Sequence, residues 1–346
     1  MKKIRVALKG RGYNIYTGYN ILARLGKIMP CKRGAIITDR KVKRIWGGEV
    51  DALDLPLYSL VPGERSKSLD TAKQVYRQLL KWGLDRNSCL IAFGGGVVGD
   101  LTGFVAATYM RGIKYIQVPT TLMAQVDSSI GGKTAVNLPE GKNLVGCFYQ
   151  PEFVLSDVKV LSTLNESELK NGLAEVVKYG MIKDKGLFEY LEQKGSRVLS
   201  MKAKEWEMIV ARCAAIKAGI VTRDEKETRG IRDVLNYGHT IGHAIETAGK
   251  YRRINHGKAV AAGMIYAGKL AVSKGFLSTD NCRRQDNLIA KLIGPGKVNL
   301  DEDILDRIKY DKKRTEDKTR FVLADRIGHV KTGCRIKEEE LKDLME

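Results

Sequence analysis

The stretch Cys89-Leu90-Ile91-Ala92-Phe93-Gly94-Gly95-Gly96-Val97-Val98-Gly99-Asp100 decides the fold class of this chain. A short apolar run, typical of a buried strand, leads into the pattern G-x-G-x-x-G at Gly94, Gly96 and Gly99, and a helical pattern follows. Such glycines let the backbone approach a pyrophosphate closely, and the N-terminus of the next helix attracts its charge. Residues 101–126 contain no acid that could bind a ribose hydroxyl, so a purely structural glycine turn stays open.

Around this stretch, short apolar runs alternate with helical patterns in the first part of the chain. This alternation is typical of βαβ units, and it predicts a Rossmann-like parallel sheet. Later in the chain, apolar residues recur at spacings of three and four, which predicts long helices. Six of the seven prolines lie at or before Pro151. We therefore expect a nucleotide-binding α/β domain over residues 1–151 and a mainly α-helical metal- and substrate-binding domain over 152–346.

Composition narrows the class of protein further. The chain has 346 residues, of which 43% are hydrophobic, and this excludes a disordered or collagen-like chain. Its apolar runs are shorter than a membrane span requires, and its first residues resemble a strand rather than a signal peptide. We expect a cytoplasmic protein without membrane contact. The six cysteines lie at least fifty residues apart, so reduced, mostly buried thiols are expected.

The net charge of +20 raises the possibility of nucleic-acid binding. The basic residues are scattered, however, and the densest clusters, Lys41 to Arg44 and Lys312 to Arg314, hold three basic residues each. Neither cluster contains the aromatic residues on which single-stranded bases stack. We expect no nucleic-acid partner, and anionic small molecules are the better candidates for this positive charge.

A second concentration of polar residues runs from 108 to 143. Gly132-Lys133-Thr134 resembles the end of a P-loop, but the glycine that a Walker A motif needs at position 127 is Asp127. We interpret this region as a loop-rich surface that carries Arg111, Lys133, Lys142 and Asn143. These side chains suit a phosphate or a carboxylate, and a merely solvated loop is the alternative.

Three of the four histidines, His239, His243 and His256, fall within eighteen residues. His239 and His243 are four residues apart in a helical pattern, so they share one face and can supply metal ligands. Glu175 is the best candidate for a third ligand, because it interrupts an apolar helical stretch in which an unpaired carboxylate would be costly. Packed histidines without a metal are the alternative.

Taken together, these motifs resemble those of the 3-dehydroquinate synthase family, within the sugar phosphate cyclases. The resemblance spans roughly residues 35–330. It rests on the runs Gly94 to Gly103, Tyr109 to Gly112, Gln117 to Thr121, Val126 to Thr134, Gly141 to Leu144, Ala174 to Lys178, Asn236 to Ala244, His256 to Met264 and Asp311 to Lys313.

The resemblance implies a carbon–oxygen lyase of the shikimate pathway and a homodimer. Its substrate would be 3-deoxy-D-arabino-heptulosonate 7-phosphate, and its products 3-dehydroquinate and phosphate. The family uses catalytic NAD and a divalent metal, zinc or cobalt. A hydroxyl is oxidised, phosphate leaves, the hydride returns, and the ring opens and closes again as a carbocycle. The chemistry needs a hydride acceptor, a Lewis acid and cations that hold the anionic substrate.

Carried over residue by residue, the resemblance assigns three sets of side chains. Glu175, His239 and His256 resemble the metal ligands, so that His243 becomes the acid–base group, and the other catalytic residues are Glu227, Lys178 and Lys133. The substrate contacts are Arg111 (in the family from the partner subunit), Asp127, Lys133, Asn143, Lys178, Lys217, Arg232, Asn236 and Lys312. The NAD contacts are Asp39, Glu64, Lys67, Gly95, Gly96, Val97, Val98, Gly99, Asp100, Thr120, Thr121, Lys142, Leu161, Ser162 and Thr163.

The chain departs from the family pattern at a few positions. Lys258 stands where the family usually has glutamate, and the extra residue after Glu227 makes Arg229 an alternative to Arg232. Lys313 is likewise an alternative to Lys312, and His329 has no assigned role. Two other activities stay open: another sugar phosphate cyclase of the inosose or valiolone type, and a polyol dehydrogenase of the glycerol dehydrogenase type, which would release NADH.

Overall fold

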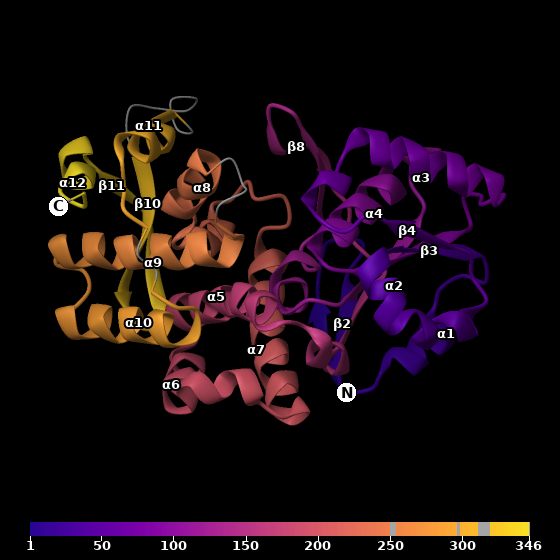
Figure 1. Cartoon of the computed structure of the whole chain (residues 1–346), viewed down its shortest axis with the longest axis horizontal. Coiled ribbons are helices and arrows are strands. Elements are labelled where there is room, and N and C mark those ends of the chain that lie inside the picture. The colour runs from indigo at the N-terminus through magenta and orange to yellow at the C-terminus, as the bar shows by residue number, and fades with distance from the viewer. Residues whose placement is uncertain (250–253, 296–297, 311–318, 346) are drawn as a thin grey trace. The chain divides into compact units, whose positions relative to one another are not determined.

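The computed structural model describes residues 1–249, 254–295, 298–310 and 319–345 (Figure 1). Contacts between residues divide the chain into two compact units, which are described separately below. Unit 1 comprises residues 1–165 and 202–226, and unit 2 comprises residues 166–201 and 227–346.

A seven-stranded sheet forms the centre of unit 1. Its strand order is β1-β2-β9-β6-β5-β3-β4, and every neighbouring pair is parallel except β1 with β2. The Rossmann-like parallel sheet expected from the sequence is therefore confirmed. The strands are β1 (Lys2–Val6), β2 (Tyr13–Gly18), β3 (Gly34–Asp39), β4 (Leu57–Leu60), β5 (Cys89–Gly94), β6 (Lys114–Pro119) and β9 (Phe153–Asp157).

Helices cover both faces of this sheet, which explains why its central strands are continuous apolar runs. In β5, Leu90 and Ala92 pack in the core under α3 and α4, whereas Ile91 and Phe93 pack in the opposite core with residues of α1 and α2. Successive side chains of a strand point to opposite faces, so both must be apolar here. The helices are α1 (Leu25–Ile28), α2 (Arg40–Trp46), α3 (Leu69–Lys81) and α4 (Gly96–Thr108).

Helix α7 (Ala203–Arg223) belongs to unit 1 although it follows two helices of unit 2. Its residues Ala214, Ala218 and Val221 pack against Val6 and Ile15 at the β1–β2 edge of the sheet. The chain thus divides elsewhere than at the expected boundary between 151 and 152. Strand β9, which lies after that boundary, is an inner strand of the sheet, so the first break falls between Asn165 and Glu166.

The polar region that we interpreted as loops contains a β-hairpin, and that interpretation is corrected here. Strands β7 (Lys133–Leu138) and β8 (Gly141–Phe148) pair antiparallel, and Ala124–Ser128 forms a short helical turn before them. Val136 of β7 is buried in the core that contains α4. Strand β7 is therefore packed on the core through Val136, whereas most residues of β8 are exposed.

Unit 2 is largely helical, as expected, and its helices α9 and α10 run side by side (Figure 1). Strands β10 (Thr319–Arg326) and β11 (His329–Ile336) form a hairpin that the sequence did not predict. Within the described part of the chain, no helix combines the length and the apolar character needed to cross a membrane. The helices are α5 (Glu166–Ile182), α6 (Lys185–Lys194), α8 (His239–Ala248), α9 (His256–Ser273), α10 (Thr279–Leu292), α11 (Glu302–Tyr310) and α12 (Glu338–Lys342).

The expectation of reduced thiols is wrong for one pair of cysteines. Cys31, in the loop after α1, and Cys89, the first residue of β5, form a disulfide whose Cα atoms are 6.3 Å apart. The two residues are 58 positions apart in the chain, so only the tertiary fold brings them together. Of the free cysteines, Cys213 and Cys282 are buried, whereas Cys147 is exposed.

Candidate active site

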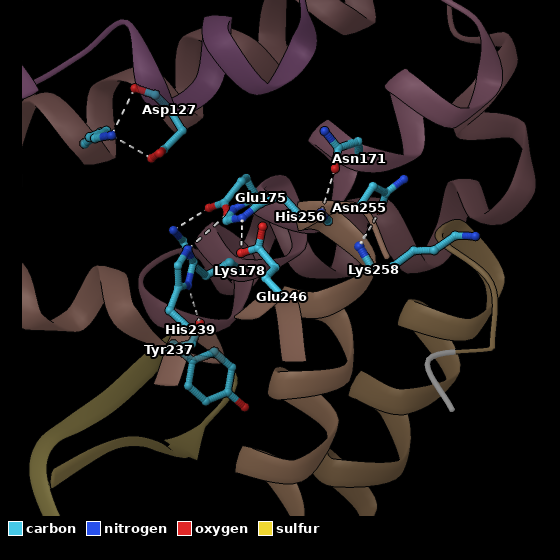
Figure 2. Close-up of polar contacts among 12 residues, drawn as sticks. Asp127, Asn171, Glu175, Lys178, Tyr237, His239, Glu246, Asn255, His256 and Lys258 are labelled. Atoms are coloured by element: carbon cyan, nitrogen blue, oxygen red, sulfur yellow. Dashed lines mark hydrogen bonds and ion pairs between the residues drawn. The ribbon is translucent and has the colours of Figure 1, made fainter. Parts of the chain in front are cut away.

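Three side chains of unit 2 converge in a group that can hold a metal ion. Glu175 lies on α5, whereas His239 and His256 are the first residues of α8 and α9 (Figure 2). Glu175 Oε1 is 3.4 Å from His239 Nε2 and 3.2 Å from His256 Nε2. All three ligand atoms lie within 4.8 Å of one another. The structure thus brings together the three residues that the family resemblance assigned to the metal.

The distances between these atoms fit a small divalent ion. Zinc bonds to imidazole nitrogen and carboxylate oxygen at about 2.0–2.1 Å, and tetrahedral angles then hold neighbouring donor atoms roughly 3.4 Å apart. The two distances from Glu175 Oε1 are close to this value. Two imidazoles and one carboxylate leave a coordination position open, which is typical of catalytic rather than structural zinc sites. The donor set therefore suits a catalytic metal.

The surroundings of these ligands shift their pKa values. Burial would raise the pKa of Glu175, but Lys178 and His239 outweigh it and hold the pKa well below its usual range. Burial and the nearby Lys178 lower the pKa of His239. Burial also acts to lower the pKa of His256, yet hydrogen bonds to Glu175 and Glu246 raise it to about 10. Near neutral pH Glu175 is thus an anion and His239 a neutral imidazole, which are the forms that bind metals, whereas His256 is protonated and would release its Nε2 proton to a metal.

His243 lies beside the three ligands but is not one of them. Its ring centroid is 5.3 Å from that of His239 and 6.4 Å from that of His256. The pair of ligands that spacing alone indicated, His239 with His243, is therefore replaced by His239 with His256. Burial and the neighbouring His239 lower the pKa of His243 to about 4, so its imidazole is neutral near pH 7 and can accept a proton.

The remaining candidate residues of unit 2 differ in exposure. Lys178 is buried and forms an ion pair with Glu175. Arg232 is only 2% exposed, whereas its alternative, Arg229, is exposed. Glu227 is half-buried with a left-handed φ of 57°, and Asn236 is exposed. Lys312 and Lys313 lie outside the described residues.

Lys258, the departure from the family pattern, lies two residues after His256. Its backbone N–H donates to Asn255 Oδ1, which caps α9. Its side chain is exposed, and Figure 2 shows it pointing away from the three ligands. Lysine at this position is therefore compatible with the metal group.

The glycine turn lies in unit 1 at the point where the strand order reverses. The chain runs outward from β3 to β4 and then returns to β5, on the other side of β3, before continuing to β6. Ligands of doubly wound sheets bind at the carboxyl ends of the strands at such a point. A Cβ atom on Gly99 would lie 2.8 Å from Gln117 Oε1, at the end of a side chain of β6, so this glycine lets α4 approach β6 closely. Both observations fit a dinucleotide.

Asp39 ends β3, beside the glycine turn that follows β5. It accepts hydrogen bonds from the backbone N–H groups of Lys41 and Val42, at 2.8 and 2.9 Å, and so caps α2. The acid next to the glycine turn therefore comes from before the turn in sequence.

Another set of candidate residues forms a connected network in unit 1. Lys67 is 5% exposed, and its Nζ donates to Asp100 Oδ2 and to Asn143 Oδ1, both at 2.5 Å. Asn137, in the β7–β8 hairpin, donates to Glu64 at 2.8 Å and accepts the backbone N–H of Asn143 at 2.9 Å. Sequence reasoning missed Asn137, which no motif marked.

The other candidates of unit 1 have these surroundings. Lys217 of α7 forms an ion pair with Asp127 at 2.8 Å. The packing of α7 in unit 1 thus brings two expected substrate contacts together. Arg111 has a left-handed φ of 66° after α4, and Lys133 is exposed at the start of β7. The remaining candidates are Lys142 in β8, Thr120 and Thr121 after β6, and Leu161, Ser162 and Thr163 in the short helix Val158–Thr163.

Comparison with known proteins identifies the family of this chain. The family model for the 3-dehydroquinate synthase N-terminal region matches residues 57–171, and that for the C-terminal region matches residues 172–314. A curated 3-dehydroquinate synthase from Desulforamulus reducens is 44% identical, covering 99% of this chain and 98% of that protein. One from Dictyoglomus turgidum is 43% identical, covering 100% and 98%.

Solved structures give the same relationship. A 2-deoxy-scyllo-inosose synthase in complex with carbaglucose-6-phosphate, NAD+ and Co2+ has a TM-score of 0.88 and 28% identity, covering 99% of both chains. A 2-epi-5-epi-valiolone synthase from Streptomyces hygroscopicus, with NAD+ and Zn2+ bound, has a TM-score of 0.87 and 25% identity, covering 98% of this chain and 97% of the other. With both family models and full-length relatives matched, the chain belongs to the 3-dehydroquinate synthase family.

Proposed function

We propose that this protein is a 3-dehydroquinate synthase, which converts 3-deoxy-D-arabino-heptulosonate 7-phosphate into 3-dehydroquinate and phosphate. The observation that carries the proposal is the group formed by Glu175, His239 and His256, in a chain that matches 3-dehydroquinate synthases over its full length. The motifs of the glycine turn and the basic residues around it support the same activity.

The reaction needs two groups that this chain's residues suit. NAD, when bound, supplies a hydride acceptor that gives the hydride back, and a divalent zinc or cobalt ion, when bound, polarises a substrate oxygen. The turn Gly95 to Asp100 with Asp39, Lys67 and Thr120 would hold NAD, and Glu175, His239 and His256 would hold the metal.

Proton movement would fall to side chains of unit 2. His243 is neutral near pH 7 because burial and His239 lower its pKa, so it can accept a proton and return it. Lys178 stays close to Glu175, where it can keep the carboxylate ionised and present an ammonium to the substrate. Glu227 would take a proton, and Arg232 and Asn236 would bind polar groups of the substrate.

The anionic groups of the substrate would be bound by cationic and amide side chains. Lys133 and Arg111 carry positive charge, and Asn143 and Lys217 are already held by Lys67 and Asp127. Arginine and lysine side chains bind phosphate and carboxylate through charge-assisted hydrogen bonds. These contacts account for a few of the sixty basic residues, and the proposal needs no nucleic-acid partner.

We also propose that the protein is a homodimer. Several apolar side chains of unit 1 near Arg111 in sequence and on the β7–β8 hairpin are exposed: Met110 at 39%, Leu144 at 58% and Phe148 at 37%. A subunit interface on this surface would cover these side chains. In the family, Arg111 serves the partner subunit's substrate. The cytoplasm, without membrane attachment, is the proposed location.

A substrate comparison tests the proposal. The protein, supplied with metal and NAD, is expected to release phosphate from 3-deoxy-D-arabino-heptulosonate 7-phosphate and not from glucose 6-phosphate, the sugar that carbaglucose-6-phosphate imitates. Phosphate release from glucose 6-phosphate alone would instead favour a cyclase of the inosose type. Oxidation of a polyol with stoichiometric NADH would favour a dehydrogenase.

A further inference from the structure

Glu246 is a buried carboxylate beside the metal group that neither the sequence motifs nor the proposed reaction uses. It is 7% exposed and lies in the last turn of α8. Burial of an acid is costly unless it is paired, and the C-terminal end of a helix repels negative charge. A partner that compensates both penalties is therefore expected.

His256 is such a partner. Its Nδ1 lies 3.1 Å from Glu246 Oε2, while its Nε2 lies 3.2 Å from Glu175 Oε1 (Figure 2). An ionised carboxylate only accepts hydrogen bonds, so Nδ1 is the donor in this contact. Nε2 likewise donates to Glu175 when no metal is present, and a bound metal would take the place of that proton while the proton on Nδ1 stays with Glu246. The ring is thus oriented with Nε2 in the metal group.

The three ligands differ in how exposed their side chains are. The Glu175 side chain is 1% exposed and that of His239 is 12% exposed, whereas that of His256 is 31% exposed. His239 Nδ1 also faces the backbone carbonyl of Tyr237 at 3.2 Å. His256 begins α9 and is the least enclosed ligand, so it depends most on a side chain that fixes its ring.

We propose that Glu246 is a positioning residue for the metal, which holds the ring of His256 so that Nε2 faces Glu175 and His239. His239, His243 and Glu246 stand at positions i, i+4 and i+7 of α8, so one helix face carries a ligand, the proposed proton acceptor and this support. Carboxylates that accept the second N–H of a ligating histidine commonly strengthen metal binding. The inference rests on the proposed metal site and not on the proposed reaction.

Metal binding tests this role without any substrate. The metal-stripped protein and its Glu246→Ala and Glu246→Gln variants would be titrated with Co2+ and Zn2+ against a competing chelator. The visible absorption spectrum of Co2+ would be recorded for each variant. Glu246→Ala is expected to weaken binding by about 10–100-fold and to change the Co2+ spectrum. Glu246→Gln keeps an oxygen that accepts the Nδ1 proton, so it should lose less affinity.

Glu192→Gln is a matched control, because Glu192 is an ion-paired carboxylate of unit 2 that contacts Arg284 at 2.6 Å and no residue of the metal group. It is expected to leave metal affinity unchanged. If Glu246→Ala and Glu246→Gln both bind metal within about twofold of the parent, far from the loss expected, the role is contradicted. An equal loss in Glu192→Gln would contradict it too.

Two further results separate the possible failures. Should Glu246→Ala not fold, Glu246→Gln decides: a loss above about threefold supports the role, and a smaller loss contradicts it. If the parent protein binds neither Co2+ nor Zn2+, the proposed metal site itself is contradicted, and this inference with it. If the variants bind metal as expected but the parent protein shows no turnover, this inference stands and the proposed reaction is contradicted.

Discussion

The backbone N–H of Gly257 donates a hydrogen bond to Asn171 Oδ1 at 2.6 Å. Asn171 lies one helical turn before Glu175 on α5, and Gly257 follows His256 on α9. The contact therefore fastens the two helices together next to the ligands that they carry. A Cβ atom on Gly257 would lie 2.5 Å from the backbone oxygen of Asn171, so only glycine permits this approach.

Gly257→Ala is expected to destabilise the protein and weaken metal binding, because α5 and α9 must move apart. Overpacking of this kind typically costs about 1–3 kcal/mol. Thermal unfolding of the metal-free protein and Zn2+ affinity would be measured. Gly219→Ala is the control, because a Cβ atom there has nothing within 4 Å and alanine favours the helix. A Gly257→Ala variant with the stability and affinity of the parent would disprove the constraint.

His239→Ala and His243→Ala are expected to separate metal binding from catalysis. His239 supplies one of three grouped ligand atoms, so its removal should abolish tight metal binding. His243 is outside this group, so its removal should leave metal content unchanged and lower turnover strongly. Metal content after dialysis and phosphate release would be measured for both variants. Full metal occupancy in His239→Ala would overturn the assignment of ligands.

Lys67→Met is expected to destabilise unit 1 in a pH-dependent manner. Burial raises the pKa of Asp100 and Lys67 opposes this effect, so loss of Lys67 should raise that pKa further. A native carboxyl with a raised pKa binds more protons than the unfolded one, so stability falls as pH rises through this window. Fully buried pairs cost about 3–5 kcal/mol to break, and about 2–3 kcal/mol is expected here at about pH 8, because the Asp100 side chain is 20% exposed.

Urea unfolding at about pH 5 and pH 8 would measure this effect. The penalty should shrink at the lower pH, where Asp100 takes up a proton. Introducing Asp100→Asn together with Lys67→Met should remove most of the pH dependence, because the carboxylate is gone. A penalty equal at both pH values would show that Lys67 does not act through Asp100.

The disulfide between Cys31 and Cys89 is expected to stabilise unit 1. Closing a loop of 58 residues removes entropy from the unfolded chain worth up to about 4 kcal/mol. Cys31→Ser should therefore lower the midpoint of thermal unfolding under non-reducing conditions, and Cys147→Ser, at an exposed free thiol, should not. Mass spectrometry of an unreduced digest should show the two peptides linked. Quantitative alkylation of both thiols without reductant would exclude the disulfide.

The apolar runs and the glycine turn were sufficient to predict the parallel sheet and the helical second part, because both patterns are local. Helix α7 shows the limit of such patterns. Its apolar positions predicted a helix, but nothing in their spacing indicates that it packs against Val6 and Ile15 rather than the other helices. Strand β9 and the Cys31–Cys89 pair depend on tertiary contacts in the same way.

The metal group shows the same limit of local patterns for single residues. The spacing of His239 and His243 is visible in the sequence, whereas His256 comes near His239 only through the packing of α8 against α9. Family resemblance supplied His256, which spacing could not. Glu246, seven residues after His239, lies on the face that spacing had already marked, and it could have been found there.

The stoichiometry of the reaction tests the central claim most directly. The protein would be loaded with Zn2+ or Co2+, given less NAD than substrate, and supplied with 3-deoxy-D-arabino-heptulosonate 7-phosphate, while phosphate and NADH are followed together. We expect phosphate in large excess over the NAD supplied, with no net accumulation of NADH. No phosphate from the folded, metal-loaded protein, or one NADH formed for each substrate consumed, would contradict the account.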